Sequence, residues 1–347
     1  MATMQTHPAR HVLITGGSSG IGLEACRQLV EIGHRLTVLC RDAATGDRLR
    51  SELRASIATP ICDMADLESV EACASELLKQ DTPIDTLVLN AGLQYSGAKE
   101  PRWSAQGFEL TFAVNHLAHQ ALLQRLVGLL AQGDAPRLVI TASEVHDPSS
   151  GGGKVGRPAG VGTLVGLRQG PGAPMLDGSV FDAEKAYKDS KLCNLLMARE
   201  AARRLQTAGL AVPVVAWSPG LVIPRSEGGF FRYSRVHNPA GQLLFALVAR
   251  DLLQLTERPQ QAGALLTSLA TSTPELPEPF EYWSNRVLGP GRRHFERAEP
   301  SAEARDPVLA KELWELSAQH LGLRAELNAP NASPAVADRG DTPAAPH

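Results

Sequence analysis

The fold of this chain is decided by residues 11–22, which read His11-Val12-Leu13-Ile14-Thr15-Gly16-Gly17-Ser18-Ser19-Gly20-Ile21-Gly22. The apolar residues 11–15 predict a short buried strand, and the apolar spacing after Gly22 predicts a helix. A glycine turn between the two lets the backbone approach a pyrophosphate and aims the first free N–H groups of the helix at it. The glycines fall at 16, 20 and 22, a GxxxGxG rather than a GxGxxG spacing, and such a turn is in other chains only a tight turn.

A second strand is predicted over residues 35–40, and it runs into Arg41-Asp42. In a Rossmann unit the residue after the second strand lies beside the adenosine ribose, where an acid accepts the 2′-hydroxyl and an arginine accommodates a 2′-phosphate. Arg41 therefore favours NADPH as the cofactor. Asp42 is a competing signal, although its position also suits a turn or a helix cap. A plain surface Arg–Asp pair is the alternative for both residues.

Two further apolar segments, residues 61–64 and 86–92, are each predicted to be a strand that closes on small or polar residues. Ligands of open parallel sheets bind outside the carboxyl ends of the strands. Asp63 would then face the adenine, and the segment after the later strand would pass under the cofactor. The cofactor-binding residues predicted so far are Gly16, Ser18, Ser19, Gly20, Ile21, Gly22, Arg41, Asp63, Asn90, Ala91 and Gly92.

Tyr187 and Lys191 lie four residues apart in the stretch AYKDSK, so they share one side of any helix that carries them. A lysine held beside a tyrosine favours the phenolate and predicts a phenol pKa below its usual value of about 10. The hydroxyl would then exchange a proton near neutral pH. Taken alone, the spacing is equally typical of a solvated helix surface, and an isolated Asn115 on a helix would be a capping or packing residue.

Six signals occur in order along the chain, and on them it resembles the short-chain dehydrogenase/reductase family. They are the TGGSSGIG turn, Asn90-Ala91-Gly92, Asn115, Ser143 just after a predicted strand over 138–141, the Tyr187/Lys191 pair, and the turn Ser218-Pro219-Gly220. The resemblance implies an α/β fold: a single Rossmann-like domain with a doubly wound parallel sheet.

The same resemblance implies roles for particular residues. In that scheme Tyr187 donates the proton, and Ser143 orients the substrate oxygen or the phenol. Lys191 binds the nicotinamide ribose and acidifies the phenol, while Asn115 holds a water that relays protons. The implied catalytic tetrad is Asn115, Ser143, Tyr187 and Lys191, and Tyr187, Lys191, Pro219 and Gly220 join the cofactor site.

Forty-three residues separate Ser143 from Tyr187, far more than in ordinary members of that family, so residues 146–184 are predicted to be an insertion near the active site. The insertion and YKDSKLCN are similar to the light-dependent protochlorophyllide oxidoreductases, a narrower family. Over residues 10–323 this similarity implies that NADPH delivers a hydride to a ring double bond of the excited pigment. The matching segments are 163–167, 173–178 and 181–194, with shorter ones at 99–101, 107–110, 115–116, 282–284 and 313–317.

Departures from the narrower family concern the substrate. Leu221 follows Pro219-Gly220 where that family carries a cysteine linked to proton delivery, the lid over 225–231 diverges, and Ser143 replaces the usual threonine. Three functions stay open: a reductase of the protochlorophyllide type, a light-independent carbonyl or alcohol reductase for another large apolar substrate, and a non-catalytic dinucleotide-binding protein. The complete tetrad argues against the third.

Composition excludes other classes of protein. A net charge of −3 and a pI near 6.4 provide no basic field for nucleic acid. No apolar run reaches the ~18 residues of a membrane span, and the start lacks the core of a signal peptide, so a soluble cytoplasmic protein is expected. Five cysteines lack metal-ligand spacing and are expected to be buried thiols, without disulfide or metal: Cys26, Cys40, Cys62, Cys73 and Cys193.

Three segments stand apart from this core pattern. The glycine-rich residues 148–172 suit either a loop over the active site or an inert excursion. Residues 328–347, rich in Pro, Ala and Asp, are predicted to be a disordered tail. Residues 240–256 predict an amphipathic helix that packs in the core or, as the narrower family suggests, touches a membrane or the pigment.

Overall fold

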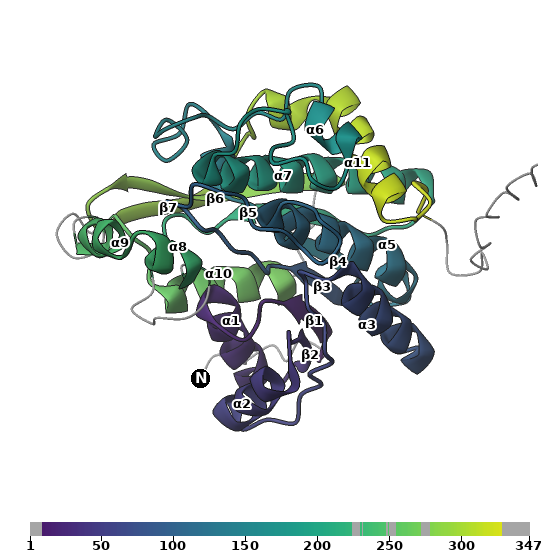
Figure 1. Cartoon of the computed structure of the whole chain (residues 1–347). Helices are drawn as coiled ribbons and strands as arrows, with labels where there is room; N and C mark the ends of the chain where they lie inside the picture. The colour runs from purple at the N-terminus through teal and green to yellow at the C-terminus, as the bar shows by residue number, and fades with distance from the viewer. Residues whose placement is uncertain are drawn as a thin grey trace, which may run out of the picture.

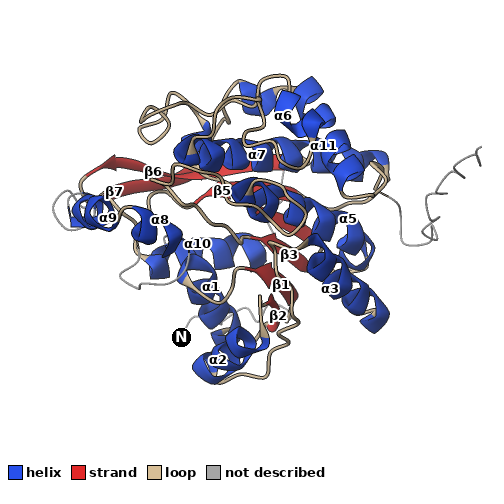
Figure 2. Cartoon of the chain, viewed as in Figure 1, coloured by secondary structure: helices blue, strands red, loops and turns tan. Residues whose placement is uncertain are grey.

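The structure is a computed structural model that describes residues 9–223, 230, 232–247, 249, 255–271 and 278–327. The strands of this part form one seven-stranded sheet in the order β2-β1-β3-β4-β5-β6-β7 (Figure 2). Strands β1 to β6 pair in parallel, and β7 pairs antiparallel to β6 as a hairpin. The strands are β1 (His11–Thr15), β2 (Arg35–Leu39), β3 (Thr86–Leu89), β4 (Arg137–Thr141), β5 (Val214–Ser218), β6 (Phe280–Gly289) and β7 (Arg292–Arg297).

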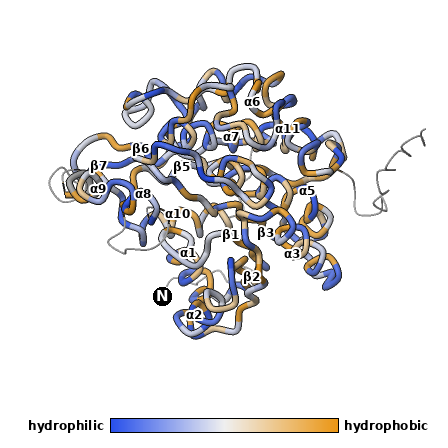
Figure 3. Tube along the Cα trace, in the orientation of Figure 1, coloured by the Kyte–Doolittle hydropathy of each residue, from blue (hydrophilic) through white to orange (hydrophobic). Residues whose placement is uncertain are grey.

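Helices cover both faces of this sheet (Figure 1). In Figure 3 they alternate between hydrophobic and hydrophilic residues, as expected of helices that pack by one side. The α-helices are α1 (Gly20–Glu31), α2 (Ala43–Leu53), α3 (Leu67–Gln80), α4 (Leu110–Phe112), α5 (Ala118–Ala131), α6 (Val165–Gln169), α7 (Ala183–Thr207), α8 (Arg232–His237), α9 (Pro239–Ala246), α10 (Pro259–Thr271) and α11 (Pro307–His320). A π-helical turn, Ala113–Leu117, joins α4 to α5, and 3₁₀ turns cover Glu144–His146 and Glu303–Arg305.

Strand β1, which lies between β2 and β3, separates two apolar cores because its side chains alternate between the faces of the sheet. Val12 and Ile14 pack with α1 and α10, whereas Leu13 packs with the core formed by α3, α5, α7 and α11. The result is a three-layer α/β/α domain, which confirms the predicted doubly wound fold. All five cysteines are buried and free.

Strand order also fixes where a ligand can bind. The chain leaves β1 through α1 to reach β2 on one side, and β3 lies on the other side of β1. The connection after β1 and the connection that leads into β3 thus run to opposite sides of β1, and this leaves a crevice at the carboxyl ends of β1 and β3. Such a crevice is the usual ligand site of an open α/β sheet. The glycine turn after Thr15 and the segment after Leu89 both open into this crevice.

Residues 61–64 do not form the predicted strand. Ile61 makes only an isolated bridge to Cys40, and a second isolated bridge joins Thr37 to Ala58. The intervening Pro60 has no N–H to donate, so a regular ladder cannot continue along the edge of β2. The segment still accepts and donates single bonds there, such as Cys62 N–H to the Cys40 carbonyl at 2.7 Å.

The core interpretation of residues 240–256 is wrong for Leu243 and Leu247, whereas Ala249 of the same segment is buried. Leu243 is 73% exposed and Leu247 55% exposed, because α9 lies at the margin of the molecule beside β7 (Figure 1). Residues 248 and 250–254 of that prediction, and the predicted tail from 328, lie outside the described residues. Among the helices that are described, none is both long enough and apolar enough to span a membrane.

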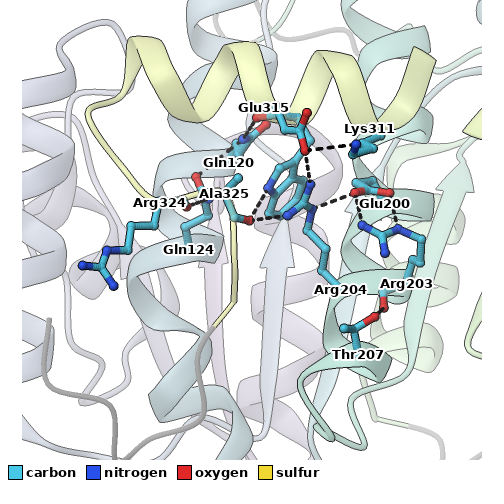
Figure 4. A network of polar contacts seen from close by, with 11 residues as sticks. Gln120, Gln124, Glu200, Arg203, Arg204, Thr207, Lys311, Glu315, Arg324 and Ala325 are labelled. Carbon is cyan, nitrogen blue, oxygen red and sulfur yellow. Dashed lines mark hydrogen bonds and ion pairs between the residues drawn. The ribbon is translucent and has the colours of Figure 1, made fainter. Parts of the chain in front are cut away.

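The C-terminal helix α11 is tied to α5 and α7 by a polar network (Figure 4). Arg204 of α7 donates to Glu200 at 2.7 Å, to the Ala325 carbonyl at 2.8 Å and to Glu315 at 3.2 Å. Its guanidinium also lies 5.4 Å from the ring of the fully buried Trp314. The LWELS segment that carried part of the resemblance therefore packs the domain together and does not line the cofactor crevice.

We expect Glu200→Ala to destabilise the fold, because Glu200 is buried and its loss leaves the buried Arg204 guanidinium with only the half-exposed Glu315 as a carboxylate partner. Breaking one side of a buried ion pair costs about 3 kcal/mol of the free energy of unfolding. Urea denaturation followed by circular dichroism measures this. The matched control is Glu76→Ala, since Glu76 is exposed and pairs with Lys79 at only 4.0 Å. Equal losses in the two variants would contradict the assignment.

Candidate active site

The glycine turn between β1 and α1 has no room for a side chain at Gly16 or Gly22. A Cβ on Gly16, whose φ is +68°, would lie 2.7 Å from the Cα of Ala91, and one on Gly22 would lie 2.8 Å from Nδ2 of Asn90. Gly20 also has a positive φ of +56°, but a Cβ there would meet open space. Ser19 caps α1 without a side-chain hydrogen bond, so the first N–H groups stay available to an anion. The turn fits the pyrophosphate of a dinucleotide.

The hydroxyl of Thr15 joins the end of β1 to the segment after β3. It accepts the N–H groups of Asn90 at 2.8 Å and Ala91 at 2.9 Å. It lies 2.9 Å from Nε2 of His119, whose Nδ1 lies 3.0 Å from the carbonyl of Asn115. Because a carbonyl only accepts, Nδ1 carries the proton and Nε2 accepts from Thr15. Burial lowers the pKa of His119 to about 3, which keeps the ring neutral.

Asn115 is fully buried and lies in the π-helical turn before α5. Its side chain is bonded on both sides: Oδ1 accepts the Leu93 N–H at 2.8 Å, and Nδ2 donates to the Leu93 carbonyl and to Ser190 Oγ, each at 3.0 Å. Asn115 therefore fixes the segment after Gly92 against helix α7. Lys191 Nζ lies on the same side, 3.6 Å from where a Cβ on Gly92 would be.

Ser143, Tyr187 and Lys191 converge at the carboxyl end of β4. The phenol of Tyr187 lies beside the side chain of Ser143, which lowers the phenol pKa in part. Lys191 Nζ lies 5.7 Å from the centroid of the Tyr187 ring and donates to the Thr141 carbonyl at 3.2 Å. The structure thus brings all four residues of the predicted tetrad to one end of the sheet. Sequence analysis missed His146, whose Nδ1 donates to the Ser143 carbonyl at 2.7 Å.

The predicted lowering of the phenol pKa by Lys191 is wrong for the structure described. Burial is the largest influence and raises the pKa of Tyr187, while the neighbouring Ser143 side chain lowers it in part. Burial also lowers the pKa of Lys191 to about 8, which weakens its charge as a source of acidification. The phenol is consequently protonated throughout the neutral range, the form that a proton donor needs.

Helix α7 uses its opposite side to hold the insertion. Lys185 and Asp189 lie two residues from Tyr187, which places them about 200° around the helix from it. Lys185 Nζ lies 2.5 Å from Asp189 Oδ2 and 3.1 Å from Asp177, and Asp189 Oδ1 accepts the N–H of Gly160 at 2.9 Å. Burial raises the pKa of Asp189 to about 7. These contacts hold residues 160–177 on the side of α7 away from Tyr187.

Lys188 fixes a second part of the predicted insertion, residues 153–157, on α7. The Lys188 ammonium donates to the carbonyls of Gly153 at 3.1 Å, of Val155, and of Arg157 at 2.9 Å. The glycine-rich loop is therefore wrapped around a charge of the catalytic helix, and its contact with a substrate stays a prediction. In the stretch YKDSK, Tyr187 and Lys191 therefore face the crevice, whereas Lys188 and Asp189 bind the predicted insertion.

Arg41 and Asp42 follow β2 as predicted. Asp42 caps α2 and accepts the Thr45 N–H at 2.8 Å, so its alternative role as a helix cap is confirmed. Arg41 Nε lies 3.2 Å from Asp42, and both side chains are about half exposed at the crevice. Asp63 accepts the Ala65 N–H at 3.0 Å in a tight turn nearby. Contact of Arg41 or Asp63 with the adenosine stays a prediction.

The turn after β5 is pinned by residues that sequence analysis missed. Gly220 has a φ of +76°, and a Cβ there would lie 2.7 Å from the Asn285 carbonyl. Asn285 is buried and donates through Nδ2 to the Pro219 carbonyl at 3.2 Å and to Glu257 at 3.0 Å. No local pattern links residues 219, 257 and 285, so only the folded chain shows that they form one unit.

Apolar side chains close the crevice beyond Tyr187. The ring of Phe230 lies 5.3 Å from the Tyr187 ring in an edge-to-face arrangement. Phe230 and Leu221 pack together with the buried Ile223 and Ala249. The surface beside the phenol is therefore apolar and aromatic. Within the described residues, no group of three or more His, Cys, Asp or Glu side chains is placed to hold a metal ion.

Comparison with solved structures agrees with this architecture. A crystal structure of an uncharacterized protein from Mycobacterium paratuberculosis matches with a TM-score of 0.65 at 24% identity, covering 92% of this chain and 94% of that one. The Pseudomonas aeruginosa RhlG/NADP complex matches with a TM-score of 0.58 at 22% identity, covering 80% and 96%. At such identities the likeness shows the fold alone.

Sequence comparison gives the family. The family model described as short chain dehydrogenase matches residues 10–154. Protochlorophyllide reductase B, chloroplastic, of Oryza sativa subsp. japonica is 34% identical over 321 residues, 90% of this chain and 77% of that protein. The chain therefore belongs to the short-chain dehydrogenase/reductase family and is an NAD(P)-dependent oxidoreductase. Within the family it is similar to protochlorophyllide reductases: that of Avena sativa is 33% identical, covering 90% of this chain and 99% of the other.

We expect Gly22→Ala to abolish cofactor binding, because the added methyl group would collide with the Gly16 carbonyl and the Asn90 side chain. Titration of NADPH fluorescence measures the loss. Gly128→Ala in α5 is the matched control, since a Cβ there meets nothing within 4 Å and should leave the affinity unchanged. Normal NADPH binding by Gly22→Ala would show that the turn does not hold the pyrophosphate.

Proposed function

We propose that this oxidoreductase uses NADPH to reduce a ring double bond of protochlorophyllide in a light-dependent reaction. The observation that carries the proposal is the assembly of Asn115, Ser143, Tyr187 and Lys191 at one end of the sheet. Its support is strengthened because protochlorophyllide reductases match 90% of the chain.

In this proposal the residues of the chain have distinct tasks. Bound NADPH supplies the hydride. The glycine turn binds the pyrophosphate, and the buried Lys191 reaches the nicotinamide ribose. Tyr187 donates the proton to the neighbouring carbon, which its raised pKa favours because the phenol stays protonated at neutral pH. Ser143, which lies beside the phenol, then stabilises the phenolate until it regains a proton.

Leu221 supports a second candidate, a light-independent carbonyl or alcohol reductase acting on another large apolar substrate. In the narrower family, a cysteine thiol at this position is implied to take part in proton delivery. In this chain the position holds Leu221, an apolar side chain that packs with Ile223, Ala249 and Phe230. The same tyrosine, serine and lysine would protonate a carbonyl oxygen in place of a ring carbon. The two candidates share their cofactor site and differ in substrate and in the need for light.

We expect a red-shifted chlorophyllide band after illumination of the purified protein with NADPH and protochlorophyllide, and no such band in darkness. Absorption spectra of wild type and of Tyr187→Phe measure this, with the variant about 10²-fold or more slower because the proton donor is lost. Pigment binding without conversion by the wild type would favour a missing proton-delivery step. No pigment binding at all would favour the second candidate.

We expect Arg41→Ala to weaken NADPH binding by about tenfold or more while leaving NADH affinity nearly unchanged, because only NADPH presents a 2′-phosphate to the guanidinium. Fluorescence titration with both cofactors gives the two affinities. Arg54→Ala, a change of the residue that follows α2, serves as the control. Equal losses of affinity for NADPH and NADH would contradict the preference for NADPH. The roles proposed for Tyr187 and Ser143 would be unaffected.

A further inference from the structure

Two arginines share one aromatic ring near the mouth of the crevice. The guanidinium carbon of Arg102 lies 4.4 Å from the centroid of the Tyr233 ring, and that of Arg232 lies at the same distance. Arg232 also donates to the Tyr233 hydroxyl at 2.8 Å. Arg102 is exposed, while Arg232 and Tyr233 are half-buried. We name these three residues the arginine–tyrosine cluster.

Buried hydrogen bonds hold the parts of this cluster together. The fully buried Ser234 accepts the Ser96 N–H at 3.1 Å, which ties α8 to the segment that follows β3. The Arg102 N–H donates to the Tyr95 hydroxyl at 3.1 Å, and that hydroxyl donates to the buried Glu109. The two arginines, 130 positions apart in sequence, are therefore brought together by the fold and not by a flexible surface encounter.

The cluster adjoins the catalytic residues on the substrate side. Phe230, two positions before Arg232, lies 5.3 Å from the Tyr187 ring. Tyr233 packs against the buried cluster that contains Leu93, whose backbone is bonded to Asn115. A ligand that covers Phe230 beside the phenol would therefore reach the two guanidinium groups at its edge.

The charges of the cluster are not balanced within the described residues. Neither Arg102 nor Arg232 forms an ion pair with a carboxylate there, whereas Arg125 pairs with Glu71 at 2.8 Å and Arg297 pairs with Glu278 at 3.0 Å. Two like charges beside one ring repel each other, and an anion bound between them removes that cost. Guanidinium groups present paired N–H donors that match the two oxygens of a carboxylate.

We infer that Arg102 and Arg232 bind a carboxylate at the edge of the apolar substrate and so select acidic substrates over neutral ones. The inference rests on the proposed function, since protochlorophyllide carries a free propionate on a large apolar ring. The aromatic surface of Phe230 receives the apolar body, and the arginine–tyrosine cluster fixes its orientation relative to Tyr187. Arg102 and Arg232 are thus specificity-determining residues outside the catalytic tetrad.

The test compares protochlorophyllide with its methyl ester in wild type, Arg102→Met, Arg232→Met and the double variant, each saturated with NADPH. Fluorescence titration gives pigment affinities. We expect the double variant to bind the acid roughly 10- to 100-fold more weakly, and to bind the ester as the wild type does. Arg102→Lys should bind the acid more tightly than Arg102→Met and more weakly than the wild type, because lysine keeps the charge but lacks the paired donors.

Arg305→Met, at a half-exposed arginine on the 3₁₀ turn Glu303–Arg305, is the matched control and should change neither affinity. Equal losses for acid and ester would show a structural role and overturn the inference. Equal affinity of the wild type for acid and ester would overturn it as well, even if the double variant did not fold. The proposed function would survive either result, whereas a wild type that binds neither pigment would remove both.

Discussion

The rest of this structure depends on the joining of the ends of β1 and β3 by one buried hydroxyl. Thr15 accepts two backbone N–H groups from the segment after β3 and donates to His119. Because His119 in turn donates to the Asn115 carbonyl, the glycine turn, the segment after β3 and the π-helical turn that carries Asn115 are held together. Thr15, His119 and Asn115 are all fully buried, so breaking these hydrogen bonds would leave buried polar groups unpaired and is costly.

Helix α7 contacts the crevice with one side and residues 160–177 with the other. One side presents Tyr187 and Lys191 to the crevice, and the opposite side binds the insertion through Lys185 and Asp189. A buried helix that is fixed on both sides cannot rotate without breaking ion pairs or losing core contacts. Residues 160–177 thereby support helix α7, a role that depends on no contact with substrate.

Burial shifts the pKa values of the titratable groups at the crevice more than neighbouring charges do. Tyr187 has a raised pKa and Lys191 a lowered one, because both charged forms are poorly solvated there. A protonated phenol beside an apolar aromatic wall suits proton donation to a large apolar substrate. The recognition of a carboxylate that we infer would take place at the edge of this wall, where Arg102 and Arg232 lie beside Tyr233.

The sequence by itself determined the features that neighbouring residues control. Strand β1 and the glycine turn, the cap at Asp42, and the shared side of Tyr187 and Lys191 follow from periodicity and backbone requirements within a few residues. Tertiary structure alone decided the sign of the Tyr187 pKa shift, the exposure of Leu243 and the meeting of Arg102 with Arg232. Burial and long-range contact are properties of segments far apart in the chain, and no local pattern encodes which distant side chains will exclude water from a given group.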